Sequence, residues 1–299
     1  MWIFKAWKSD DRISIKFKEI NDLNSMSIIP YITPRESKYL THYNTGLGNA
    51  LFQIASCYGL SKKYNIKIYY NYVIDYCNIL KDRYGFNHCD TILRKCKHVL
   101  DSELILSIIE TSGNNRNLDY GIINRIEEDL NNNYHIIGYL ESVDYFIKYK
   151  DNIRDLFSAD EYSLMIIKER YPILFSGIES VSIHFRFNEC SYTFDNTYYR
   201  EAIKLINMML EHSTFLIFSD DKSKVNIEEL GLKPVNTQFI NLEYDYLDLW
   251  AMSFCKHHIS SNSTFAFWGT FLSLNTKNKS IIISPKNLSV DWYSDSIKL

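Results

Sequence analysis

The hydrophobic pattern in the second half of the chain alternates between two periods. Short apolar runs, bounded by polar residues, predict strands at 181–183, 214–219, 238–241, 258–260 and 280–284. Amphipathic stretches between these runs predict helices at 198–210, 245–254 and 264–273. Because strands and helices take turns along the chain, the pattern predicts a parallel sheet covered by helices.

The first half carries the same pattern in a weaker form. Residues 38–43 and 66–72 predict strands, and a glycine turn after the first strand leads into a helical pattern that ends at Lys63. Strand, turn and helix in this order open a βα unit. Further along, the pattern predicts a strand at 134–142 and helices at 101–109, 120–130, 143–157 and 158–171, the last opened by a capping box.

The same reading divides the chain into domains. The charged, weakly periodic residues 1–36 predict an N-terminal appendage, and the stretch from Pro172 to Gly177 marks a boundary before the next strand. The expected fold class is α/β, with two Rossmann-like domains, 37–172 and 173–299, that face each other across a cleft.

Composition and charge narrow the class of protein. Apolar residues make up 46% and charged residues 23%, ordinary values for a soluble globular protein, and the net charge of −3 argues against a nucleic-acid partner. The six cysteines form no C-x-x-C pair, so a reduced, cytosolic environment fits best. The N-terminus becomes charged too early for a signal peptide, and no apolar run is long enough to span a membrane. We therefore expect a soluble, cytoplasmic protein without a transmembrane segment.

Candidate chemistry lies where the predicted strands of the second half end. The strand that begins at Val181 runs into His184 and Arg186, at the sheet edge where α/β proteins bind ligands. An arginine there presents a planar, permanently charged fork that suits a phosphate or diphosphate. A salt bridge at the end of the strand is the equally weighted alternative.

Acidic residues follow the next strand. Asp220 and Asp221 come directly after Ser219, and a carboxylate at this edge can accept hydrogen bonds from the N1 and N2 protons of guanine. The alternative, which has about equal weight, is that one of these aspartates caps the following helix. The sequence leaves both interpretations open.

Two stretches predict open helix N-termini. Ser261, Asn262, Ser263 and Thr264 lead into the helix that begins near residue 265, so that hydroxyls, N–H groups and the helix dipole converge on a site that suits a phosphate without a metal.

The second open helix N-terminus follows Gly46 and Gly48, earlier in the chain. These two glycines lack the third glycine of a dinucleotide fingerprint. A tight turn that needs positive φ is therefore the favoured interpretation of these glycines. Asn49 beside them either binds a ligand or caps the helix.

Six segments together resemble the α-1,2-fucosyltransferases of glycosyltransferase family 11. That family carries G-G-L-G-N, G-Y-F-Q-S-x-x-Y-F, H-x-R-R-G-D-Y, Y-Y-x-x-A-I, F-S-D-D and C-K-H-x-I-x-x-N-S-S-F-S-W-W-G. The matching segments of this chain are 45–49, 138–146, 184–190, 198–203, 218–221 and 255–269. Their order and spacing agree from about Lys38 to Trp292.

This resemblance implies a two-domain GT-B-like fold, GDP-fucose as donor, a glycan as acceptor, inversion at the anomeric carbon, and no metal or other cofactor. The donor would bind to the C-terminal domain and the acceptor to the N-terminal one. By position, Arg186 would hold the diphosphate, His184 would shape the guanosine pocket, and Asp220 or Asp221 would meet the base. Ser263 and Thr264 would bind phosphate oxygens, and Gly46, Gly48 and Asn262 would also belong to the donor-binding site. Asn49 would face the reaction centre.

The chain departs from the family pattern at several positions. Phe187 stands where the second arginine of H-x-R-R is expected, Asn188 and Glu189 replace G-D, and Thr45 replaces the first glycine. Two alternatives follow: the same reaction with another nucleotide-sugar donor, or a non-catalytic member that binds a glycan or a nucleotide. The candidates for the general base are Glu189, Glu141 and Asp144.

Overall fold

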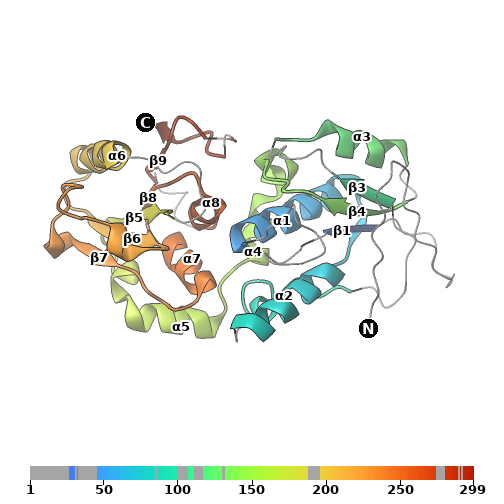
Figure 1. The fold of residues 1–299 in the computed structure, drawn as a ribbon, viewed down its shortest axis with the longest axis horizontal. Coiled ribbons are helices and arrows are strands. Elements are labelled where there is room, and N and C mark those ends of the chain that lie inside the picture. Colours follow the sequence, from blue (N-terminus) through green and yellow to red (C-terminus); the bar gives the residue numbers. More distant parts are fainter. Residues whose placement is uncertain are drawn as a thin grey trace.

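Two parallel β-sheets, one from each half of the chain, form the framework of the protein (Figure 1). The structure is a computed structural model. It describes residues 27–30, 32, 46–84, 87–99, 107–110, 117–129, 132–187, 196–273, 280–288, 290 and 292–299. The predicted strand at 38–43 and the candidate Glu189 lie outside these residues.

The first sheet has the strand order β2-β1-β4-β3, and all its neighbouring strands are parallel. Its strands are β1 (Ser27–Pro30), β2 (Lys67–Ile68), β3 (Ser107–Glu110) and β4 (Asn133–Ile137). The helices of this half are α1 (Leu47–Tyr64), α2 (Asn71–Tyr84), α3 (Tyr120–Glu128), α4 (Lys150–Leu156) and α5 (Glu161–Arg170).

Several predictions for the first half were wrong. Residues 27–30, assigned to an appendage, form the inner strand β1, which pairs on both sides. Residues 107–109, predicted as the end of a helix, belong to β3, and α2 had no predicted counterpart. The predicted helix at 143–157 is broken into two short 3₁₀ helices and α4. The cap of α5 is Asp160 in place of Ser158, since its Oδ1 accepts the Ser163 N–H at 2.9 Å.

The second sheet confirms the predicted parallel arrangement. Its strand order is β10-β9-β8-β5-β6-β7. The strands are β5 (Ser180–Phe185), β6 (Thr214–Ser219), β7 (Thr237–Phe239), β8 (His257–Ile259), β9 (Ile282–Ser284) and β10 (Ile297–Lys298). The helices are α6 (Asn196–Met209), α7 (Asp245–Ser253) and α8 (Thr264–Phe271).

The two faces of the second sheet contribute to different hydrophobic clusters. Val181 and Ile183 of β5 belong to a cluster with buried residues of α6. Leu216 and Phe218 of β6 belong to a larger cluster that includes α7, α8 and the core of the first half. Since side chains alternate along a strand, one face is closed by α6 and the other is turned towards the first half.

An aromatic cluster joins the two halves. α1 and α8 lie side by side in the middle of the molecule (Figure 1). The ring of Phe52 in α1 stacks on that of Phe267 in α8, with 4.7 Å between the ring centroids. It meets the ring of Trp268 edge to face, with 5.1 Å between the centroids. Trp292, near the end of the chain, lies 5.8 Å from Phe52. Burial of several large rings at one interface fixes the relative position of the two halves.

Cysteine pairing differs from the expectation. Cys77 and Cys89 form a disulfide between α2 and the short 3₁₀ helix η1 (His88–Asp90), which the sequence did not predict. Cys57, Cys96 and Cys255 are free and buried. The cytosolic environment stays a prediction.

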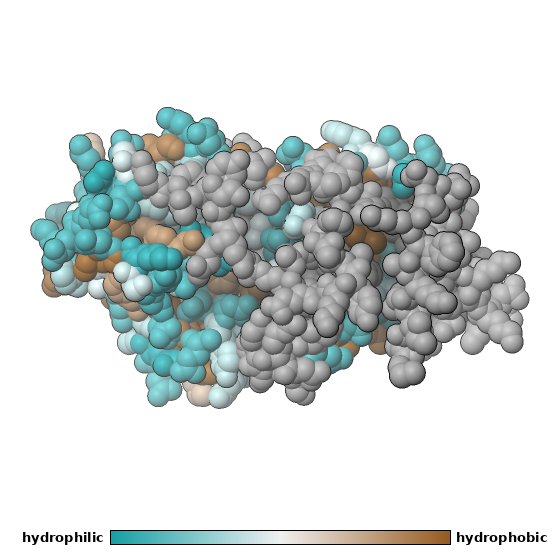
Figure 2. Space-filling model, in the orientation of Figure 1, coloured by the Kyte–Doolittle hydropathy of each residue, from teal (hydrophilic) through white to brown (hydrophobic). Residues whose placement is uncertain are grey.

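The surface and the helices give further information on the class of protein. Among the described helices, none combines the length and the apolar character that crossing a membrane requires. Where the C-terminal half is coloured in Figure 2, hydrophilic side chains predominate, with smaller apolar areas between them.

Candidate active site

The end of β5 places His184 in a buried, polar position. Its Nδ1 shares a hydrogen bond of 2.7 Å with the hydroxyl of Ser261, and its backbone carbonyl accepts the Tyr199 hydroxyl at 3.0 Å. Burial, with the nearby charge of Arg186, lowers the pKa of His184 to about 3. The imidazole is therefore neutral over the physiological range, and it holds β5 against the loop that precedes α8.

Arg186 is fixed by Asp220. Its Nη1 lies 3.0 Å from Oδ2 of Asp220, whose Oδ1 accepts the backbone N–H of Phe187 at 2.9 Å. The Arg186 side chain is 32% exposed, so the guanidinium keeps access to a ligand. The predicted salt bridge at the strand end is present, and it also orients the group that was predicted to bind an anion.

Asp221 is a helix cap. Its Oδ1 accepts hydrogen bonds from the N–H and the hydroxyl of Ser223, and its Oδ2 pairs with Lys224 at 3.0 Å. These bonds open the 3₁₀ helix η5 (Lys222–Lys224). Of the two interpretations that the sequence left open, capping is the one that the structure shows for Asp221.

The N-termini of α1 and α8 meet between the two halves. Gly46 and Ser263 are their N-caps, and neither helix has a side-chain cap or an acidic residue in its first turn. The hydroxyl of Thr264 donates to Oδ1 of Asn49 at 2.7 Å, across 215 positions of the chain. Two positive helix ends thus lie at one place, which favours an anion. The hydroxyl of Thr264 has one proton, and the bond to Asn49 uses it. Thr264 can therefore donate its backbone N–H, but not its hydroxyl, to a phosphate.

The glycines of this turn serve a different purpose from the one predicted. Gly46 has φ −76°, and Gly48 is absent from the positive-φ residues of the described chain, so the predicted need for positive φ was wrong. A Cβ on Gly48 would come within 2.6 Å of the Thr264 hydroxyl oxygen and 2.7 Å of the Phe265 nitrogen. The carbonyl of Gly48 also accepts the indole N–H of Trp268 at 2.8 Å. Gly48 is therefore required for the close approach of α1 to α8.

The remaining predicted residues are placed as follows. Asn262 lies in the loop before α8, and its Oδ1 is buried without a hydrogen-bond partner in the described part of the chain. Glu141 is fully buried, and its carbonyl accepts the indole N–H of Trp292 at 2.9 Å. Asp144 is exposed and lies beside Ser142. The structure therefore gives no ranking of the general-base candidates.

Sequence reasoning missed the residues that position the site. Ser261 holds the ring of His184, and Tyr199 holds its backbone. Both residues stood inside recognised segments, but a motif does not reveal which of its members touch each other. Repeated hydroxyl residues next to a strand end were the available signal.

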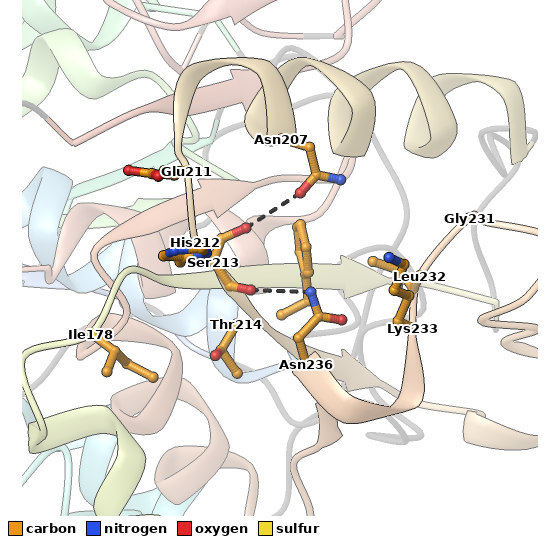
Figure 3. Close-up of a pocket in the computed structure, with 11 residues that line it drawn as sticks. Ile178, Asn207, Glu211, His212, Ser213, Thr214, Gly231, Leu232, Lys233 and Asn236 are labelled. Carbon is orange, nitrogen blue, oxygen red and sulfur yellow. Dashed lines mark hydrogen bonds between the residues drawn. The ribbon is translucent and has the colours of Figure 1, made fainter.

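A separate pocket of about 440 Å³ opens at the other edge of the second sheet (Figure 3). Its lining includes Thr214, the first residue of β6, whereas Asp220 follows the last residue of that strand. Two hydrogen bonds close the preceding loop, from the Ser213 hydroxyl to Asn207 at 3.4 Å and from the Asn236 amide to the Ser213 carbonyl at 3.3 Å (Figure 3). None of the predicted site residues lines this pocket.

In the part of the chain that the structure describes, no three His, Cys, Asp or Glu side chains are grouped so as to hold a metal ion. Arg186, the neutral His184 and the two helix N-termini are groups suited to binding an anion.

An α/β fold with two parallel sheets is the architecture of GT-B-like glycosyltransferases, which confirms the predicted fold class. Residues 123–298 match Glycosyl transferase family 11. The match covers more than half of the chain, so the protein belongs to this family and is a glycosyltransferase, as its motifs indicated.

Two curated relatives are from Escherichia coli. The chain is 23% identical over 248 residues to an alpha-1,2-colitosyltransferase, covering 76% of this chain and 84% of the relative. It is 25% identical over 194 residues to the O-antigen biosynthesis glycosyltransferase WbnK, covering 60% of this chain and 62% of the relative. The crystal structure of the fucosyltransferase NodZ from Bradyrhizobium is similar in fold, with a TM-score of 0.53, 13% identity, and coverage of 83% of this chain and 93% of NodZ.

Proposed function

We propose that this glycosyltransferase moves fucose from GDP-fucose to a hydroxyl group of a glycan, forming an α-1,2 linkage with inversion and without a metal ion. The single observation that carries the proposal is the meeting of the α1 and α8 N-termini, joined by Thr264 and Asn49. The family and the six motif segments support GDP-fucose as the donor and α-1,2 as the linkage.

The donor diphosphate is proposed to bind between these helix ends and Arg186. Each helix N-terminus carries about half an elementary charge, and the first-turn N–H groups have no intrahelical partner. Asp220 holds the guanidinium in one orientation, so little rearrangement is needed when the phosphate arrives. As the sugar leaves, negative charge grows on the diphosphate, and each fixed donor lowers the barrier by about 3 kcal/mol.

The guanosine is proposed to lie against the end of β5 and β6. Neutral His184 is proposed to form one side of this pocket, and the Asp220 carboxylate, which also holds Arg186 and the Phe187 N–H, is proposed to accept from N1 and N2 of guanine. Asp220 is preferred to Asp221, since Asp221 caps η5.

The two halves take different substrates in this proposal. Residues 173–299 bind the donor and residues 37–172 bind the glycan, which brings the acceptor hydroxyl to the junction near Asn49. The Oδ1 of Asn49 accepts from Thr264, which leaves its Nδ2 to donate to the sugar or to the leaving oxygen. The general base is proposed to be one of Glu189, Glu141 and Asp144.

A different nucleotide sugar is the second candidate donor, and one observation favours it. Phe187 replaces a cation of the family motif, and its ring lies parallel to Phe185 at 6.0 Å with the Lys224 ammonium 5.6 Å from its centroid. One relative is named for transfer of colitose, so transfer of another sugar is known by name among similar chains.

Thermal unfolding with GDP, UDP and dTDP tests the donor nucleotide. A ligand that binds only the folded state at a hundred times its Kd stabilises it by about 2.7 kcal/mol, so GDP is expected to raise Tm while UDP and dTDP leave it unchanged. If GDP gives no shift, the assignment to GDP-fucose is wrong, and a shift with UDP or dTDP identifies the alternative donor.

Turnover tests catalysis separately. With GDP-fucose and a glycan acceptor, the parent protein is expected to release GDP, and Arg186→Ala is expected to lose at least a hundredfold in kcat/KM. A parent protein that binds GDP but never releases it from GDP-fucose is a non-catalytic member of the family.

A further inference from the structure

The Cys77–Cys89 disulfide lies directly beside a contact between the two halves of the chain. Cys77 belongs to α2 and Cys89 to η1. His88, the residue before Cys89, places its Nε2 2.9 Å from Oδ1 of Asp245, the first residue of α7. The His88 side chain is 2% exposed. One short segment therefore carries both the disulfide and a partly buried hydrogen bond to the other half.

The ring of His88 is held on both sides by aromatic residues. It stacks on the ring of Tyr76, with 6.2 Å between the ring centroids and 6° between the ring planes. It meets the ring of Tyr246 edge to face, with 6.0 Å between the centroids. Tyr76 precedes Cys77 in α2, and Tyr246 follows Asp245 in α7. The disulfide thus ties together the two segments that supply Tyr76 and His88, and it sets the distance between them.

The backbone hydrogen bonds of η1 are local: the carbonyls of Asn87 and His88 accept N–H groups of residues 90–93. It is three residues long, and its cap is the side chain of Asn87, which accepts the Cys89 N–H at 2.9 Å. Short 3₁₀ helices have poor hydrogen-bond geometry and depend on their surroundings. Because these bonds stay within the segment, the disulfide at Cys89 is the covalent link that ties the segment, and with it His88, to α2.

On the other side of the contact, α7 packs against α8. α7 is anchored by Trp250, whose indole N–H donates to the Phe157 carbonyl at 2.9 Å. The N-terminus of α8 carries Ser263 and Thr264, which belong to the candidate active site. Asp245 is thus on the element that supports the helix proposed to bind the donor.

We infer that the Cys77–Cys89 disulfide is a redox-sensitive device that keeps His88 on Asp245, and that its reduction lowers transferase activity. In the reducing step, a dithiol transfers two electrons and two protons: its own sulfurs form a disulfide, the Cys77–Cys89 bond breaks, and both cysteines become thiols. A small-molecule disulfide such as oxidised glutathione reverses the exchange. The effect on activity rests on the proposed function, whereas the effect on His88 does not.

The experiment compares the full-length protein after treatment with oxidised glutathione and after treatment with dithiothreitol. On reduction, hydrogen exchange is expected to accelerate in residues 87–93 and at the start of α7, and kcat/KM for GDP-fucose is expected to fall at least threefold. The double variant Cys77→Ser with Cys89→Ser should match the reduced protein under both conditions. His88→Ala, with the disulfide intact, should be low in activity in both states.

The control is Cys57→Ala, which removes a free, buried thiol elsewhere and should keep the full response to redox treatment. The inference is overturned if exchange at residues 87–93 and at α7 is the same in both redox states, or if the double variant is as active as the oxidised parent. If no donor is turned over, the exchange measurement still decides the structural part, so that a failure of the proposed function is recognised separately.

Discussion

Gly48 of α1 and Thr264 of α8 lie so close that a methyl group on Gly48 would come within 2.6 Å of the Thr264 hydroxyl oxygen. Two further contacts within 2.8 Å would be with backbone atoms of Phe265 and Thr264, which cannot rotate away. The absence of a Cβ at this position therefore sets how closely the two helices, and with them the two halves, approach each other.

Gly48→Ala is expected to destabilise the protein by about 2 kcal/mol, because the two helices must move apart to make room for the methyl group. Donor turnover should fall at least tenfold, since the helix ends no longer meet at the same distance. Chemical denaturation and GDP release are the measurements. Gly46→Ala is the matched control: a Cβ there meets nothing within 4 Å, and the φ of −76° suits alanine.

Thr264→Val tests the hydrogen bond between the halves. Valine keeps the shape of threonine but cannot donate to Asn49, and loss of one such bond costs about 1 kcal/mol. We expect kcat to fall more than donor affinity, because Asn49 loses its orientation at the reaction centre. Thr270→Val removes a hydroxyl of the same helix that bonds the Ala266 carbonyl at 3.1 Å and Tyr293 but not Asn49, and it should leave kcat unchanged. Equal kinetics for the two variants would contradict the role given to Thr264.

The second sheet was predictable because its inner strands are buried on both faces. Phe215 to Phe218 form a continuous apolar run, and such runs between amphipathic stretches are typical of parallel sheets. In the first sheet, β1 is four residues long and ends at Pro30, a residue that is untypical of inner strands because it lacks a backbone N–H. Its partners β2 and β4 lie about 40 and 106 positions away, so nothing near it in sequence marks it as an inner strand.

The candidate site was predictable in its members but not in its contacts. His184, Arg186 and Asp220 stand at strand ends, which pattern alone identifies. The bond between Thr264 and Asn49, the close approach at Gly48 and the Cys77–Cys89 disulfide depend on how elements pack after folding. Sequence spacing carries no information on such contacts.

Asp220→Asn tests whether Asp220 orients Arg186. The amide keeps the shape and can still accept the Phe187 N–H, but it loses the charge that pairs with the guanidinium. We expect KM for the donor to rise about tenfold, measured by initial rates at fixed acceptor. Asp151→Asn, which removes an exposed carboxylate 3.5 Å from Arg154, is the control and should not change KM. An unchanged KM in Asp220→Asn would show that the charge of Asp220 is not what orients Arg186.

Two buried histidines predict how stability depends on pH. Burial lowers the pKa of His184 and of His258 from 6.5 to about 3. The unfolded chain takes up protons on these residues below pH 6.5 while the folded protein does not, so stability is lost as pH falls from 6.5 towards 3. Each histidine contributes a slope of about 1.4 kcal/mol per pH unit in that range.

His258→Gln isolates one of these contributions away from the proposed donor site. His258 bonds the Ser182 hydroxyl at 2.8 Å inside the sheet, and glutamine can replace that bond without titrating. Between pH 5.5 and 4.5, the free energy of unfolding of the variant is expected to fall less steeply than that of the parent, by about 1.4 kcal/mol per pH unit. Above pH 7 the two slopes should coincide, because neither form of His258 is protonated there. Parallel curves down to pH 4.5 would mean that His258 is protonated in the folded protein as readily as in the unfolded chain.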